Sequence, residues 1–188
     1  MHSLFRFVSF CVMATTVTWA GPKHEEALTL FENRKVVVEV PDGFSVKTNA
    51  DEAGLTIVQL AATKDKVTAS LLFLPDTDRQ YATTRGRAEK MVEDFKEYVD
   101  GSVEKAMQFE ELEPKAGAGT YCVFTDAKLV GQTELPPNEY HNLTCGVKSW
   151  PGVVVIFRVF HNDTTSPEYQ GVMKMLRESV QERTVPLK

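Results

Sequence analysis

Two cysteines, Cys122 and Cys145, are the most reactive side chains of this sequence beyond residue 20. Their spacing differs from Cys-x-x-Cys, which is typical of redox-active pairs. Two cysteines in an oxidising compartment are more typical of one structural disulfide. A loop of this length, once closed, stabilises a fold by about 3 kcal/mol in the chain-entropy model. The sequence therefore predicts a Cys122–Cys145 disulfide that acts as a structural crosslink and not as a catalytic site.

Three histidines also remain beyond residue 20, namely His24, His141 and His161. His141 and His161 lie near the start and the end of adjacent predicted strands, and Asp163 follows the second of them. No His-x-His, His-x-x-x-His or Cys-x-x-Cys spacing is present. A metal site needs several ligands that converge with a defined geometry. We therefore interpret these histidines as surface or loop residues, and we expect neither a metal site nor a cofactor.

A catalytic nucleophile needs a base within hydrogen-bond reach and a third group that orients the base. The sequence has no Gly-x-Ser-x-Gly, and Ser70 and Ser149 lie in predicted strands without a recognisable partner. The adjacent acids Glu110 and Glu111 are typical of a solvated surface. Residues 117–120, Gly-Ala-Gly-Thr, lead into a strand, whereas a phosphate loop precedes a helix N-terminus. The sequence predicts no catalytic residue.

Arg158 interrupts the otherwise apolar segment 153–160. A buried charge must be paired and hydrogen-bonded. An internal ion pair or a position near a strand end would satisfy this requirement. Alternatively, Arg158 anchors an anionic ligand or the carboxylate of a partner, with His161 beside it. The sequence leaves both interpretations open, and Arg158 and His161 are its candidate ligand-binding residues.

The first twenty residues have the three parts of a secretory signal. They are the basic residue Arg6, the apolar run 7–13, and small residues at Thr18 and Ala20. The apolar run is too short to cross a bilayer, which takes about 20 apolar residues. We expect cleavage after Ala20, export to the periplasm or the medium, and no membrane insertion of the processed chain. The alternative is an apolar N-terminal core helix.

The chain is moderately acidic, with 26 Asp and Glu residues against 21 Lys and Arg residues. Nucleic-acid binding calls for a basic face and an anionic membrane for a polybasic anchor, so we expect neither as a partner. Two glycosylation sequons, which begin at Asn142 and Asn162, matter only if the source is a secreting eukaryote.

The strand signals come in pairs. Residues 36–40 alternate apolar and polar positions, and residues 44–48 follow the turn Pro41-Asp42-Gly43, so the two segments predict a hairpin. Residues 55–62 and 67–74 predict a second pair. Three later strands are expected over residues 120–129, 140–149 and 153–160. The last is apolar on both faces, which is typical of a central strand covered on both sides.

Two helices are predicted from apolar residues at helical spacing. The first lies between Thr77 and Gly101, with Thr77 or Thr83 as its start. The second begins with Ser166 as N-cap and has Pro167 in its first turn. We expect the apolar stripes of both helices to pack in the core.

This order of elements predicts one α+β domain, in which a mainly antiparallel sheet is flanked by helices. We expect a signal peptide over residues 1–20 and a leader over 21–31, either a short amphipathic helix or a mobile segment. The domain is expected over 32–183, followed by a tail over 184–188.

The opening segment Val38-Glu39-Val40-Pro41-Asp42-Gly43-Phe44-Ser45-Val46, and the strand 153–160 before the Ser166 helix, resemble the PsbP-like fold. This αβα sandwich is shared by photosystem extrinsic proteins and DcrB-type bacterial periplasmic proteins. The resemblance is one of topology, spans residues 32–183 and brings no catalytic motif.

The resemblance implies a binding, assembly or accessory module. Our leading hypothesis is a non-enzymatic exported accessory domain that binds another exported or envelope protein. The second is a carrier of a small ligand or a metal, which would use a cavity under the sheet. The third is a hydrolase.

Overall fold

The computed structural model describes residues 16–18, 24–50, 55–62 and 67–182. Most of the predicted signal peptide and the predicted tail therefore lie outside the described residues. The described chain forms a single α+β domain with a mainly antiparallel sheet and flanking helices, as the sequence predicts.

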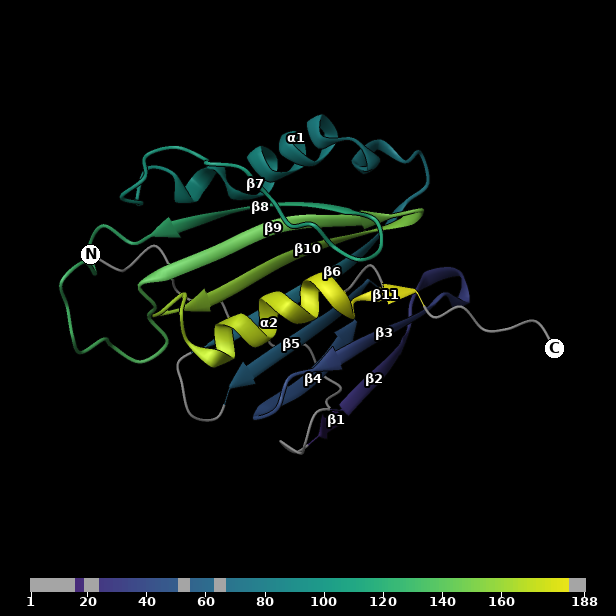
Figure 1. Cartoon of the computed structure of the whole chain (residues 1–188), viewed down its shortest axis with the longest axis horizontal. Helices are drawn as coiled ribbons and strands as arrows, with labels where there is room; N and C mark the ends of the chain where they lie inside the picture. Colours follow the sequence, from purple (N-terminus) through teal and green to yellow (C-terminus); the bar gives the residue numbers. More distant parts are fainter. Residues whose placement is uncertain (1–15, 19–23, 51–54, 63–66, 183–188) are drawn as a thin grey trace.

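The large sheet has eight strands, and every pair of neighbours in it is antiparallel (Figure 1). From one edge to the other its strands are β1 (Thr16–Thr18), β4 (Phe44–Ala50), β5 (Thr56–Ala62), β6 (Thr68–Asp76), β10 (Gly152–His161), β9 (Asn142–Trp150), β8 (Ala118–Thr125) and β7 (Glu110–Glu111). The expected pairing of the segments 55–62 and 67–74 is confirmed by β5 and β6, and the three later strands are confirmed by β8, β9 and β10.

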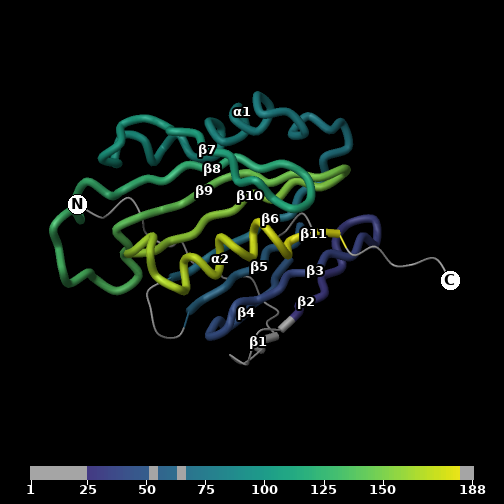
Figure 2. The backbone as a smooth tube through the Cα atoms, in the orientation of Figure 1, coloured from purple at the N-terminus to yellow at the C-terminus, as the bar shows by residue number. Residues whose placement is uncertain are grey.

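A second sheet brings the last described residues beside an early part of the chain. It has three strands in the order β11 (Gln181–Glu182), β3 (Lys35–Val40) and β2 (His24–Thr29), and the short 3-10 helix η1 (Phe31–Asn33) connects β2 to β3. The yellow end of the traced chain lies beside its purple beginning in Figure 2, where Gln181 pairs with Val37.

Two α-helices cover opposite faces of the large sheet. They are α1 (Thr84–Phe95) and α2 (Pro167–Glu178), and the 3-10 helices η2 (Gln80–Ala82) and η3 (Lys96–Tyr98) flank α1. Alternate residues of β10 divide between the two cores: Val155 and Phe157 share a cluster with α2, whereas Val154 and Ile156 share a cluster with α1. The prediction of a central strand that is buried on both faces is therefore confirmed.

The predicted hairpin of residues 36–48 is wrong. β3 and β4 belong to different sheets, because the turn after Pro41, with Gly43 at a φ of 80°, carries the chain from the small sheet into the large one. Alternation identifies a strand with one buried face, but it does not identify the partner strand. Both strands turn their apolar side chains, such as Val38 and Val46, towards the same core.

The predicted leader also differs from the structure, because residues 24–29 within it form β2 and not a helix. Leu28 and Leu30 are buried while Ala27 and Thr29 are exposed, which is the period of a strand. Pairing along β3 gives this segment its backbone hydrogen bonds.

The helix starts follow local capping. Thr83 Oγ1 accepts a hydrogen bond from the Gly86 backbone amide at 3.0 Å, so α1 begins there and not at Thr77. Ser166 Oγ accepts from the Tyr169 amide at 3.2 Å, as expected for the N-cap of α2. Val92 belongs to the apolar stripe of α1 that was expected to pack in the core, but it is 46% exposed.

A buried lysine on β9 anchors the C-terminal end of α2. Lys148 Nζ donates to the carbonyl oxygens of Leu176 at 2.8 Å and Val180 at 2.5 Å. Burial lowers the pKa of Lys148 to about 8. The carbonyl groups that end a helix carry partial negative charge and favour a nearby cation.

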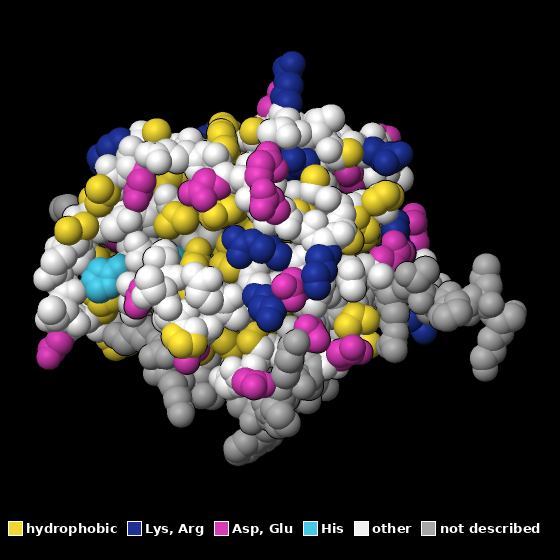
Figure 3. Space-filling view, viewed as in Figure 1, with side chains coloured by type: hydrophobic (Ala, Val, Ile, Leu, Met, Phe, Trp, Pro, Cys, Tyr) yellow, Lys and Arg dark blue, Asp and Glu magenta, His cyan; other side chains and the backbone are white. Residues whose placement is uncertain are grey.

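The outer face around α2 carries both signs of charge. Dark-blue basic and magenta acidic side chains are interspersed there in Figure 3. One ion pair recorded at the end of α2 joins Lys115 to Glu178 at 3.7 Å, with both side chains partly exposed. Exposed pairs of this kind contribute little to stability, so α2 is held mainly by its apolar face.

Candidate functional site

A cavity of about 150 Å³ opens at one end of the large sheet, where β6 and β9 end, β8 begins, and the η2 turn lies against them. It is lined by Asp76, Arg79, Ala82, Gly117, Ala118, Ser149, Trp150 and Pro151. A cavity of this size holds a molecule about as large as benzene.

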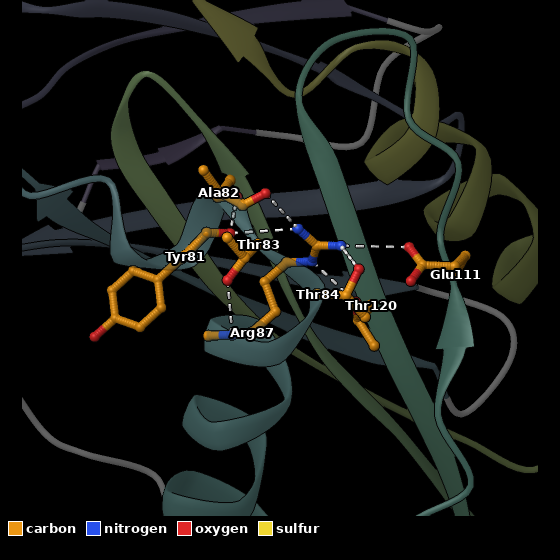
Figure 4. Close-up of polar contacts among 9 residues, drawn as sticks. Tyr81, Ala82, Thr83, Thr84, Arg87, Glu111 and Thr120 are labelled. Carbon is orange, nitrogen blue, oxygen red and sulfur yellow. Dashed lines mark hydrogen bonds and ion pairs between the residues drawn. The ribbon is translucent and has the colours of Figure 1, made fainter.

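The wall formed by η2 is fixed by a buried arginine. Arg87 on α1 is 2% exposed, and its guanidinium donates to the carbonyl oxygens of Ala82 at 3.1 Å and Tyr81 at 3.4 Å. The same group donates to Thr120 Oγ1 at 2.9 Å and contacts a carboxylate oxygen of Glu111 at 3.5 Å (Figure 4). Arg87 therefore ties η2, α1 and β8 together beside the cavity.

Close contacts between backbone segments also shape this wall of the cavity. Ser149 Oγ donates to the Tyr81 carbonyl oxygen at 2.7 Å. Gly117 has a φ of 81°, and a Cβ atom there would lie 2.0 Å from the Ser149 carbonyl oxygen. A Cβ atom at Gly86 would lie 1.9 Å from the Gln80 carbonyl oxygen. Only glycine fits at both positions, so the cavity wall is a constrained feature.

Two of the lining residues carry a buried polar atom that has no hydrogen-bond partner within the described residues. Asp76 is 3% exposed and its Oδ1 accepts no hydrogen bond; Trp150 is 7% exposed and its Nε1–H donates none. Buried polar groups are nearly always hydrogen-bonded, so each exception calls for an explanation. The Trp150 indole packs in the core under α2, with its ring centroid 5.7 Å from Lys148 Nζ, whereas the Asp76 side chain lies on the α1 face with Leu72 and Leu74. The unpartnered oxygen of Asp76 is therefore the one on the side of the sheet where the cavity opens.

Arg79 adds a positive charge to the same cavity. Its side chain is exposed, and its backbone is left-handed with a φ of 54°. That conformation costs a residue other than glycine on the order of 1 kcal/mol, and it persists where the surrounding structure enforces it. Here the Arg79 amide donates to the Asp76 carbonyl oxygen, and Arg79 precedes η2 directly.

The two residues expected to form a ligand anchor lie on opposite faces of β10. The guanidinium carbon of Arg158 stands 4.9 Å from the ring centroid of Phe95, on the face covered by α1. This cation–π contact is the interaction that the structure shows for the guanidinium, whereas an internal ion pair was one of the interpretations left open by the sequence. His161 lies on the face covered by α2, so the structure does not bring Arg158 and His161 into one site.

His161 is a buried core residue, which corrects its interpretation as a surface or loop histidine. Its Nε2 lies 3.0 Å from Thr144 Oγ1, which in turn lies 3.0 Å from the Tyr169 hydroxyl. Burial lowers the pKa of His161 to about 4, although the nearby Asp163 opposes this shift. His141 does lie in a connecting segment, with its Nε2 2.8 Å from the Gln132 carbonyl oxygen.

Cys122 and Cys145 are directly opposite each other on β8 and β9, which confirms that they are neighbours. In this structure they are two buried free thiols and not a disulfide, since their sulfur atoms are 3.6 Å apart. A disulfide requires about 2.05 Å and an oxidant. Burial raises the pKa of Cys145 well above its ordinary value, and both thiols lie beneath α1.

Within the described residues, no three His, Cys, Asp or Glu side chains converge as metal ligands. No helix in the described part of the chain is long and apolar enough to cross a membrane. No family model, curated protein or solved structure matches this chain. The PsbP-like resemblance therefore stays a prediction.

The cavity residues Asp76, Arg79 and Trp150 are not among the residues predicted from the sequence, and neither is Arg87. They come from β6, the turn before η2, β9 and α1, and no motif links them. The sequence does contain one signal for Arg87. This residue lies at helical spacing from the apolar residues Met91 and Phe95, so its charged side chain is placed on the buried face of α1.

We predict that His161 makes the fold sensitive to acid. The unfolded chain binds a proton near pH 6.5, whereas the folded chain binds it only near pH 4. Stability is therefore full above about pH 7 and falls as the pH drops towards 4, by about 3 kcal/mol. Urea unfolding at several pH values should show this fall in the wild type and a smaller fall in His161→Phe. His141→Gln is the matched control, and equal pH dependence in all three proteins would contradict the prediction.

Proposed function

We propose that this chain is an exported, non-catalytic binding domain, and that the cavity between β6, β8, β9 and η2 is its small-molecule site. The observation that supports this best is the buried acid Asp76 in the cavity lining, whose Oδ1 atom has no hydrogen-bond partner within the described residues. Ligand sites typically combine an apolar lining with a few convergent polar groups.

The rigidity of the cavity also supports a binding role. Arg87 fixes η2 through two backbone carbonyl groups, and Gly117 lets β8 approach Ser149 closely. A site that is already formed loses little conformational freedom when a ligand binds. The small volume restricts the ligand to a compact molecule.

Filling the cavity tests this proposal. Ala118→Leu places a larger side chain in the cavity lining, so it should abolish binding of any ligand held there. The measurement is saturation-transfer NMR on the processed chain with a set of small amines, carboxylates, amino acids and sugars. Ala61→Leu, at a half-buried position on β5 away from the cavity, should leave binding unchanged. Binding that survives Ala118→Leu would place the site elsewhere.

Recognition of another exported protein is a second candidate, and the outer edge of β4 favours it. In the described chain this edge is paired with β1 over Val46 to Thr48, and β1 precedes the expected cleavage after Ala20. A processed chain would present that edge for strand addition by a partner.

Site-specific crosslinking tests this second candidate. A photo-crosslinking residue at Lys47, in the middle of the paired stretch of β4, should capture one discrete exported protein in the processed chain. The same residue at the exposed position Asp78 should not capture it. An unprocessed chain that gives the same crosslink at Lys47 would count against edge recognition.

We also propose that Cys122 and Cys145 are oxidised to a disulfide after export. Thiol–disulfide exchange with a disulfide-bearing oxidant would form the Cys122–Cys145 bond, break both S–H bonds and reduce the oxidant to two thiols. Direct cross-strand pairing favours this reaction, because the two sulfur atoms are already neighbours.

Oxidation should be visible in both mass and stability. Non-reduced protein from the exported fraction should be lighter by the hydrogens that oxidation removes. It should also be more stable to urea than the reduced protein by about 3 kcal/mol, because the bond closes a loop between strands. A Cys122→Ala/Cys145→Ala double variant should not respond to reductant. A wild type that is equally insensitive to reductant would refute the disulfide.

A further inference from the structure

The core between the two sheets is bordered on one side by two strand edges. β2 is an edge strand of the small sheet, and β4 lies at the edge of the large sheet except where the three-residue strand β1 pairs with it. Leu28 of β2 and Val46 of β4 belong to the same buried cluster, so both edges border one core. Figure 1 shows β1, β2 and β4 together at the same margin of the molecule.

A groove of about 390 Å³ lies between these two edges. One wall is formed by β2, including Glu26 and Leu28, and the other by the end of β4 and the start of β5, including Thr48 and Thr56. Leu28 is buried, and the two threonines are half-buried. The groove runs beside β4, so a segment that pairs with β4 has room for the side chains that it turns towards the core.

The edge of β4 accepts a strand in this structure. Residues 16–18 pair with it in antiparallel register, with Thr18 opposite Val46 and Thr16 opposite Thr48. A strand edge presents a row of backbone donors and acceptors, which an added extended segment satisfies. Because cleavage after Ala20 would remove β1, the processed chain would present this row of backbone groups together with the groove.

Lys47 determines which residue is favoured in the centre of an added segment. Val46 faces the core, and alternate residues of a strand face opposite sides, so Lys47 lies on the other face of the sheet. Its neighbour on β5 is the uncharged Gln59, and no ion pair involves Lys47 within the described residues. Opposite charges directly across an antiparallel pair stabilise it. An acidic residue is therefore favoured opposite Lys47.

The two positions beside that acid meet a different environment. Residues opposite Val46 and Thr48 share the face of these residues, which is the face of the core and the groove. Glu26 is the one charged residue among those that line the groove. An acid at either position would lose hydration near a like charge, whereas valine or threonine buries apolar surface and favours a strand.

A second copy of this chain is disfavoured as the occupant of the edge. Two β4 strands that paired around a two-fold axis at Lys47 would place the two Lys47 side chains directly opposite each other. Like charges in that position destabilise an antiparallel pair. A different polypeptide with an acid at this position avoids the repulsion.

We infer that β4 and the groove beside it bind an antiparallel extended segment of another exported protein, with an acidic residue opposite Lys47 and valine or threonine on either side of it. This inference rests on the second candidate function proposed above, which is edge recognition by β4. It adds the sequence pattern that the partner segment carries.

Three synthetic peptides test the inference on the processed wild-type chain. Each is acetylated and amidated and has the sequence Ser-Thr-Val-X-Val-Thr-Ser, in which X is Asp, Asn or Lys. NMR titration of the isotope-labelled protein gives both the affinity and the residues whose signals shift. The Asp peptide should bind roughly threefold or more tightly than the Asn peptide, and the Lys peptide should bind most weakly. The shifted signals should lie along β4 and β2.

A charge reversal tests the role of Lys47. In Lys47→Glu the order should be reversed, so that the Lys peptide binds roughly threefold or more tightly than the Asp peptide. Lys174→Glu, at an exposed position on α2, changes the net charge by the same amount and should keep the original order. The comparison of the three peptides on the wild type stands even if Lys47→Glu fails to fold.

The outcomes separate this inference from the candidate function on which it rests. If the three peptides bind β4 equally tightly, the acidic preference is wrong while edge recognition remains. If no peptide binds but a photo-crosslinking residue at Lys47 captures one exported protein, the predicted pattern is again wrong and edge recognition remains. If no peptide binds and no protein is captured, the inference and edge recognition both fail. A processed chain that crosslinks at Lys47 only to a second copy of itself would also refute the inference.

Discussion

The central strand β10 sets the constraint on which the rest of this fold depends. Its side chains are apolar on both faces, so both faces must be covered for the strand to leave water. α2 and the small sheet cover one face, and α1 covers the other. Burial of apolar surface is the main driving force of folding. The position of α1 in turn places η2 over the end of β9, where the cavity forms.

The interior also holds several polar side chains that make hydrogen bonds to other parts of the protein. Lys148 binds the carbonyl groups at the end of α2, Arg87 binds those of η2, and His161 shares a hydrogen bond with Thr144. Lys148 thereby links β9 to α2, and Arg87, through Thr120, also links α1 to β8, so these two residues help to specify how the helices pack on the sheet. Asp76 Oδ1 has no hydrogen-bond partner within the described residues, and His161 Nδ1 has none either. What sets Asp76 apart from His161 is its position in the lining of the cavity.

The sequence predicted features that depend on neighbouring residues and missed those that depend on distant ones. The helix caps, the late strands and the burial of β10 follow from local patterns. The partner of β3 does not, because alternation says nothing about pairing across the chain. Arg158 and His161 could have been separated from the sequence alone, since residues three apart in a strand face opposite sides. The cavity lining by Asp76 and Ser149 could not have been predicted, because these two residues come together only through the order of strands in the sheet.

The small sheet has a consequence for the timing of folding. Gln181 pairs with Val37, so nearly the last described residues form the strand that pairs with β3. A chain that emerges from a ribosome or a translocation pore with its N-terminus first exposes β3 long before β11 and α2 are available. Contacts of such long sequence separation slow folding. We therefore expect the part of the core around β3 to form last. Until β11 and α2 have been synthesised, the apolar face of β3 stays exposed.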